Sequence, residues 1–205
     1  MDYLLLGFLT GLSLIFAIGA QNIFVIEQGL KKQYIFIVCL ICSISDLILI
    51  FLGIFLFQYL NNFFTPIIAL IFNILLFVFL LNFIWGKIRS KISETSFNID
   101  NKTNNLTSVI FKTLSFTFLN PHVYSDTVFF LGNFSKSFSL IDKYYFGIGA
   151  SIASFIFFFT IGYTSKYLSK YLKSQKVWEK INLFIIIFMS ILALYILIEV
   201  ISFNY

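Results

Sequence analysis

Charge is scarce in this chain of 205 residues, of which only 11% are charged, and its mean hydropathy is +0.95. A soluble domain carries about 25% charged residues, so the composition excludes a water-soluble globule and also an intrinsically disordered segment. The net charge of +5 could suggest a polyanion partner, but the basic residues lie in short segments between long apolar runs. That placement is typical of membrane proteins, and we expect no nucleic-acid partner.

Cysteine and histidine are also rare. The only cysteines, Cys39 and Cys42, share one apolar run, so they cannot build the disulfide framework of a small secreted domain. His122 is the only histidine, and one imidazole with two interior acids offers too few hard or nitrogen ligands to favour a metal site. We therefore expect no metal, no other cofactor and no enzymatic activity.

Apolar residues, in contrast, make up 60% of the chain. They form six runs long enough to cross about 30 Å of hydrocarbon as helices, at residues 3–26, 34–60, 65–85, 109–132, 144–165 and 181–203. The first run follows Asp2 instead of a basic segment and is too long for a signal peptide, so we expect a retained span. The sequence predicts an all-α membrane protein with six transmembrane helices embedded in a lipid bilayer.

A polar stretch at residues 87–107 separates these runs into two groups of three. It predicts a linker between a first half, residues 1–86, and a second half, residues 108–205, of one membrane domain. Three crossings separate the halves, so their orientations must be opposite. Both halves also place a serine eight residues before a glycine, Ser45 before Gly53 and Ser154 before Gly162. We expect two inverted three-helix repeats, a plan common among secondary transporters.

Basic residues predict the orientation of the spans. The second connection contains no Lys or Arg, and the fourth contains only Lys136 and Lys143. Because positive charge marks cytoplasmic loops, we expect the odd-numbered loops in the cytoplasm and both termini outside an inner membrane. The first, third and fifth connections contain Lys31, Lys32, Lys87, Arg89, Lys91, Lys102, Lys166, Lys170, Lys173, Lys176 and Lys180.

The first and fourth runs each combine an asparagine with a residue that disturbs helices. Gly19 precedes Asn22 in the first run, and Pro121 follows Asn120 in the fourth. Glycine permits local unwinding, and proline removes a backbone donor. Backbone groups freed inside a bilayer need new partners, so broken helices often supply ligand sites in transporters. The alternative is a kink satisfied by neighbouring helices, with the asparagines as interhelical hydrogen-bond partners.

Two acids, Asp46 and Asp126, lie far from any expected span end. Placing a charged carboxylate there costs about 2.5–3.5 kcal/mol, so such residues usually line a cavity and have a partner. No Lys or Arg lies deep inside any run, which leaves a proton or a cationic substrate as the counter-charge. His122 stands four residues before Asp126 on the same helical face and could relay protons. The alternative for each acid is a structural aspartate bonded to a hydroxyl or amide on another span.

The Cys39-x-x-Cys42 pair suggests thiol redox chemistry. Both cysteines lie in an apolar interior without a nearby cation to favour the thiolate, so we interpret them as small buried hydrophobic residues. A membrane thiol oxidoreductase that uses this pair is nevertheless the competing class of function.

Three separated motifs resemble those of the LysE-type amino-acid exporters, in particular the lysine and arginine branch. They are Ile18-Gly19-Ala20-Gln21-Asn22, Ile44-Ser45-Asp46-Leu47 and Leu119-Asn120-Pro121-His122-Val123-Tyr124-Ser125-Asp126. The resemblance covers nearly the whole chain and implies an inner-membrane exporter of basic amino acids that exchanges them for protons. Ala20 stands where the family usually has proline, whereas the acid two residues after Tyr124 fits the basic-amino-acid branch.

Our hypothesis from sequence is that Asp46 and Asp126 face one cavity between the halves. They would bind the cationic side chain of L-arginine or L-lysine and take up protons, with His122 in proton coupling, when the substrate leaves. Exporters of neutral amino acids or of metal ions are the alternatives within transport, and a homodimer through small-residue faces stays open. The expected substrate site consists of Gln21, Asn22, Asp46, Asn120, Tyr124 and Asp126, with helix breaks at Gly19 and Pro121.

Overall fold

The computed structural model describes residues 2–16, 19–63, 65–93, 105–170 and 175–202. Across these residues the chain is helical without a strand, which confirms the all-α prediction. The elements are α1 (Tyr3–Ile15), α2 (Ala20–Lys31), α3 (Ile35–Phe63), α4 (Pro66–Ser93), α5 (Leu106–Phe118), α6 (Pro121–Tyr124), the π-helix η1 (Ser125–Phe130), α7 (Leu131–Phe134), α8 (Leu140–Leu168) and α9 (Gln175–Ile201).

Four helices, α3, α4, α8 and α9, are long and apolar enough to cross a membrane. The α1–α2 pair passes the same test as one bent span, with an angle of 83° between its two helices. The chain is thus a multi-pass membrane protein. By length and composition the described helices give four or five spans, where the sequence predicts six. The difference lies in the run at 109–132, which the structure divides among α5, α6, η1 and α7.

The predicted linker at 87–107 is shorter in the structure than in the sequence prediction. Helix α4 continues past Trp85 to Ser93, and α5 begins at Leu106, where the Asn105 side chain accepts a hydrogen bond from the Thr107 amide. Lys, Arg and Ser are compatible with a helix, so α4 need not stop where its apolar stretch ends. Residues 94–104 of the predicted linker lie outside the described residues.

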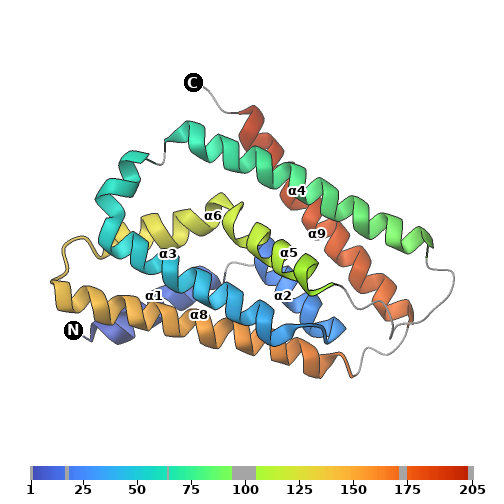
Figure 1. Ribbon diagram of the computed structural model, residues 1–205, viewed down its shortest axis with the longest axis horizontal. Coiled ribbons are helices and arrows are strands. Elements are labelled where there is room, and N and C mark those ends of the chain that lie inside the picture. The colour runs from blue at the N-terminus through green and yellow to red at the C-terminus, as the bar shows by residue number, and fades with distance from the viewer. Residues whose placement is uncertain (1, 17–18, 64, 94–104, 171–174, 203–205) are drawn as a thin grey trace.

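The helices pack reciprocally between the two halves of the chain (Figure 1). Helices α1 and α2 of the first half lie along α8 of the second, while α5, η1 and α7 of the second half lie along α3 of the first. The other helices pair with the helix at the corresponding position of the other half. Helix α3 contacts α8, and α4 runs beside α9. The C-terminal ends of α2, α4 and α8 gather at one end of the bundle, opposite the N-terminus (Figure 1).

Close approach between these helices depends on glycine. A Cβ atom on Gly7 of α1 would collide with the Phe146 carbonyl of α8, and one on Gly149 of α8 would collide with the Leu4 carbonyl of α1. On the other side, a Cβ atom on Gly53 of α3 would stand 2.6 Å from the Val128 Cα of η1. Small residues let backbones approach in this way in lipid, where van der Waals packing drives helix association.

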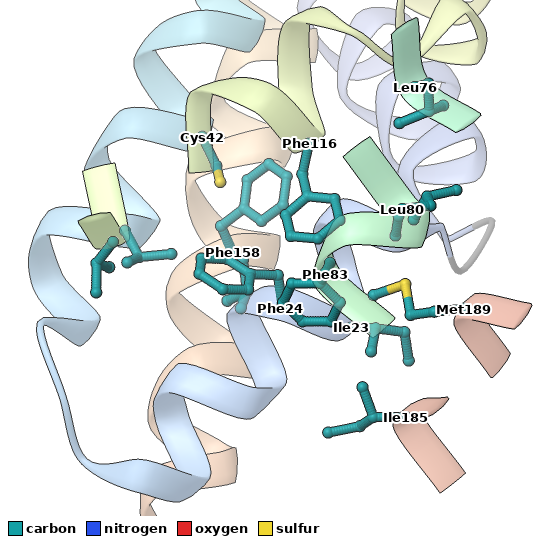
Figure 2. Packing of buried hydrophobic residues seen from close by; sticks show 14 of the residues in the cluster. Ile23, Phe24, Cys42, Leu76, Leu80, Phe83, Phe116, Phe158, Ile185 and Met189 are labelled. Carbon is teal, nitrogen blue, oxygen red and sulfur yellow. The ribbon is translucent and has the colours of Figure 1, made fainter. Parts of the chain in front are cut away.

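A cluster of phenylalanine rings joins the N-terminal broken helix to the rest of the bundle. The ring centroids of Phe24 in α2 and Phe116 in α5 are 5.1 Å apart, and Phe83 of α4 lies 5.2 Å from Phe116. Figure 2 shows these rings beside Phe158 of α8. All four side chains are buried, so α2, α4, α5 and α8 share one core.

We predict that Gly7→Ala and Gly149→Ala each destabilise the protein, because the added methyl group pushes α1 away from α8. Overpacking of this kind costs about 1–3 kcal/mol. Gly86→Ala is the matched control, since nothing lies within 4 Å of its Cβ position and alanine favours the helix. Thermal unfolding of the purified protein in detergent measures the difference. Equal melting temperatures for Gly7→Ala and Gly86→Ala would contradict the packing described here.

Candidate functional site

The first helix break lies between α1 and α2. Helix α1 ends at Ile15, and α2 starts at Ala20 with Gly19 in an extended conformation as its N-cap. The Asn22 side chain reaches back across the break, where its Nδ2 atom donates to the Ile15 carbonyl oxygen at 3.2 Å. Asparagine therefore satisfies one backbone acceptor freed by the break, as backbone inside a membrane requires.

The second break separates α5 from α6. Helix α5 ends at Phe118, and Pro121 occupies the first position of α6, where its missing N–H breaks no helical bond. The Tyr124 hydroxyl donates to the Phe118 carbonyl oxygen at 2.9 Å and so bridges this break as Asn22 bridges the first. A π-helix, residues 125–130, follows directly and contains Asp126. Short π-helical segments occur often at functional sites.

Both breaks open onto one cavity of about 250 Å³ in the interior of the bundle. Its polar wall combines the start of α2, the middle of α3 and the segment around α6. The Cβ position of Gly19 lies 3.9 Å from the Asn120 Nδ2 atom, so the two breaks face each other. The lining includes Gly19, Gln21, Asn22, Asp46, Asn120, Asp126, Thr127 and Tyr195, together with apolar residues such as Leu76, Leu80 and Phe158.

Asp46 is buried, with 3% of its surface exposed, and stands where α3 meets α8. Its Oδ2 atom accepts a hydrogen bond of 2.8 Å from the Ser154 hydroxyl, which is completely buried in α8. The alternative prediction for Asp46, a structural aspartate, included such a bond to a hydroxyl on another span. Since Asp46 also lines the cavity, the bond fixes the carboxyl group at the cavity wall and serves both interpretations.

The structure separates the remaining predicted residues. Asp126 belongs to the second half of the chain, whereas Asp46 belongs to the first. It also lines the cavity and is half-buried. Tyr124 does not line the cavity, since its ring packs against Phe72 at 5.4 Å and its hydroxyl bridges the break. The backbone of Pro121 and His122 belongs to α6, but their side chains lie outside the described residues. Their predicted roles stay predictions.

The N-terminus of α2 gives the cavity a positive pole. The first amides of this helix have no intrahelical acceptor, and the Gly19 N-cap offers no side chain to bind them. Together with the helix dipole, such amides favour an anion, for example a carboxylate. The lining of the cavity thus combines the carboxyl groups of Asp46 and Asp126 with the partial positive charge of a helix end.

Sequence reasoning missed several buried polar residues. The spacing of Ser154 to Gly162 does not indicate that its hydroxyl binds Asp46. Glu27 and Gln28, each 2% exposed, lie just past the expected end of the first run at Ile26, so the hydropathy pattern predicts no buried position for them. The signal was available, since an acid and an amide inside an otherwise apolar segment rarely become buried without a role.

Both cysteines are free and fully buried in α3. The Cys39 thiol donates to the Phe158 carbonyl of α8 at 3.2 Å, a helix-packing contact. Among the described residues, no group of three or more His, Cys, Asp or Glu side chains could hold a metal ion.

Sequence comparisons show which known proteins the chain is similar to. Residues 12–200 match the family described as LysE type translocator. The arginine exporter protein ArgO of Pectobacterium atrosepticum is 33% identical over 183 residues, which cover 87% of this chain and 88% of that protein. The ArgO protein of Pectobacterium carotovorum is 32% identical over 92% of this chain and 93% of its own length. The corresponding values for Salmonella typhimurium ArgO are 30%, 94% and 92%. No solved structure matches the chain.

We predict that Ser154→Ala destabilises the protein by about 1–3 kcal/mol, because the buried Asp46 carboxyl group loses a hydrogen-bond donor. Ser151→Ala is the matched control, since Ser151 donates within its own helix to Gly147. In an Asp46→Ala background the Ser154 substitution should cost much less. Thermal unfolding of the four variants in detergent measures this double-mutant cycle, and an equal cost of Ser154→Ala in both backgrounds would exclude the coupling.

Proposed function

The chain belongs to the LysE type translocator family, and from this premise we propose that it exports arginine or lysine across the inner membrane in exchange for protons. The observation that carries the proposal is the cavity where both helix breaks meet two acids, Asp46 and Asp126. The names of its relatives, which are arginine exporters, place arginine first among the candidate substrates. On this proposal the protein is a transporter and performs no enzymatic reaction.

The two poles of the cavity suit the two ends of a basic amino acid. The guanidinium or ammonium group would bind the carboxylates of Asp46 and Asp126, because an oppositely charged partner offsets the cost of burying an acid. The α-carboxylate would bind the amides at the start of α2, assisted by the side chains of Gln21 and Asn120. Ligand pockets for drug-sized molecules span about 300–1,000 Å³, so a cavity of 250 Å³ favours one small molecule.

Exchange with protons follows from the same acids. Moving a cation outward against an inside-negative potential costs about 2.3 kcal/mol per 100 mV, and an incoming proton cancels that electrical cost. A carboxyl group that always holds a proton or the substrate, and never both, couples the two fluxes. Asp46 and Asp126 would alternate in this way, and His122 of α6 would relay protons to Asp126 of η1.

We propose six spans in two inverted halves as the framework for this exchange. In this arrangement α1 and α2 form the first span, and α5, α6, η1 and α7 together form the fourth. The reciprocal packing supports it, since each broken span lies along the second helix of the other half. The ends of α2, α4 and α8 would face the cytoplasm, and both termini would face outward. Rocking of one half against the other would open the cavity to each side in turn.

We predict that Asp126→Asn and Asp46→Asn each reduce arginine and lysine efflux at least about tenfold, the effect of losing one 1.4 kcal/mol interaction. Asparagine keeps the size of the side chain but removes the charge that binds the substrate and the proton. Cells that lack their own basic-amino-acid exporters are loaded with labelled arginine, lysine, leucine and threonine, and efflux is followed at several external pH values. The wild-type protein should export arginine or lysine only, and faster at acidic external pH.

The double variant Cys39→Ala/Cys42→Ala is the control for this experiment. A transporter that uses the acids keeps its efflux without either thiol, whereas a thiol carrier loses all of its activity. The assigned site would be refuted if Asp126→Asn exported arginine and lysine as fast as the wild-type protein. It would also be refuted if the wild-type protein exported only leucine and threonine.

A further inference from the structure

The Ser154 hydroxyl of α8 departs from the usual behaviour of a serine inside a helix. Ser151, Thr113 and Thr117 each donate to the carbonyl oxygen four residues earlier in their own helix. Serine and threonine in helices commonly bond in this way. Ser154 instead reaches across to α3, where its Oγ atom lies 2.8 Å from the Asp46 Oδ2 atom. Its hydroxyl therefore serves a side chain of another helix.

Ser154 is placed to act through Asp46 and not on the substrate. Its side chain is completely buried and does not belong to the lining of the cavity, whereas Asp46 does. The bond between them engages the Oδ2 atom of the carboxyl group and leaves the Oδ1 atom for a ligand. Binding groups keep their geometry only when hydrogen bonds from behind hold them. Any effect of Ser154 on transport must therefore act through the orientation of Asp46.

A hydroxyl group suits a carboxyl group that gains and loses a proton. A serine hydroxyl is both a donor and an acceptor, whereas a lysine ammonium group only donates. Ser154 can donate to the carboxylate form of Asp46. It can also accept from the protonated form, if its own hydrogen turns to the Ala150 carbonyl as that of Ser151 does to the Gly147 carbonyl. The same contact between α3 and α8 can thus persist in both protonation states.

Few other titratable groups surround Asp46. Among the described residues that line the cavity, these groups are Asp126 of η1 and Tyr195 of α9. Helices α2, α7 and α8 contribute only uncharged residues to this lining, and α5 contributes none of those described. The buried Cys42 thiol stands one turn before Asp46 on α3. A ligand in the cavity must therefore supply the counter-charge of an ionised Asp46, while Ser154 supplies its orientation.

We propose that Ser154 is a positioning residue of the transport site. Its hydroxyl holds the Asp46 carboxyl group in one orientation, both when the group carries a proton and when it binds the cationic end of the substrate. Proton and substrate then meet the same fixed group in turn, as exchange at one site requires. This inference rests on the proposed function and extends the site to a residue outside the cavity.

Infrared difference spectra between alkaline and acidic pH test the protonated state without any substrate. They record the C=O stretch of carboxyl groups that take up a proton, and the band missing from Asp46→Asn belongs to Asp46. Hydrogen bonding lowers the frequency of this stretch. We therefore predict that Ser154→Ala shifts the Asp46 band to higher frequency. Ser151→Ala is the matched control and should leave the band in place, because Ser151 bonds within α8.

Calorimetry of arginine binding tests the substrate-bound state. We predict that Ser154→Ala raises the dissociation constant about tenfold, which corresponds to about 1.4 kcal/mol. Ser154→Thr keeps the hydroxyl and should bind almost as tightly as the wild-type protein. Ser154→Cys should lie between Thr and Ala, because a thiol is a weaker donor. This order follows the strength of the hydrogen bond and not the volume of the side chain, so altered packing would not produce it.

An Asp46 band that Ser154→Ala leaves unmoved would overturn the proposal, whatever the substrate is. Equal arginine affinity of Ser154→Ala and the wild-type protein would also overturn it, as would Thr and Cys variants that both bind as weakly as Ser154→Ala. The substrate assignment fails separately. If the wild-type protein did not bind arginine, a shifted Asp46 band would still support the positioning role of Ser154 and reject only the substrate.

Discussion

Backbone polar groups inside a membrane must find partners within the protein, and this requirement determines where the chain can interrupt a helix. Each of the two interruptions is bridged by one side chain, Asn22 to the Ile15 carbonyl and Tyr124 to the Phe118 carbonyl. These bridges leave the amides at the start of α2 and the polar segment around α6 facing a common space. The cavity is therefore a consequence of how the backbone groups at the two helix breaks find their hydrogen-bond partners.

The same two broken helices also explain why the two halves of the chain interlock. Glycines at the α1–α8 and α3–η1 contacts bring each broken helix against a long helix of the other half, so neither half is complete alone. Asp46 and Ser154 join α3 to α8 at the centre of this framework. On the proposed mechanism, charge at that centre selects the substrate.

The long helices could be predicted from their apolar runs, and the helix breaks from single residues such as Gly19 and Pro121. Helices α3, α4, α8 and α9, and the breaks after Ile15 and Phe118, lie close to the expected positions. One cavity is lined by Gln21, Asn22, Asp46, Asn120 and Asp126. The 83° bend, the π-helix and the bond between Asp46 and Ser154 depend on tertiary packing, which has no local signature. Tyr124 was expected to bind substrate because the motif contains it, but its hydroxyl reaches the backbone of α5 instead.

Calorimetry of arginine binding to the purified protein can show whether substrate and proton compete for Asp46 and Asp126. Titrations in buffers with different ionisation enthalpies count the protons released per arginine bound. We expect the wild-type protein to release protons when it binds arginine near neutral pH, and the Asp46→Asn/Asp126→Asn double variant to lose both binding and release. Tight arginine binding that releases no proton, or that survives in the double variant, would contradict it.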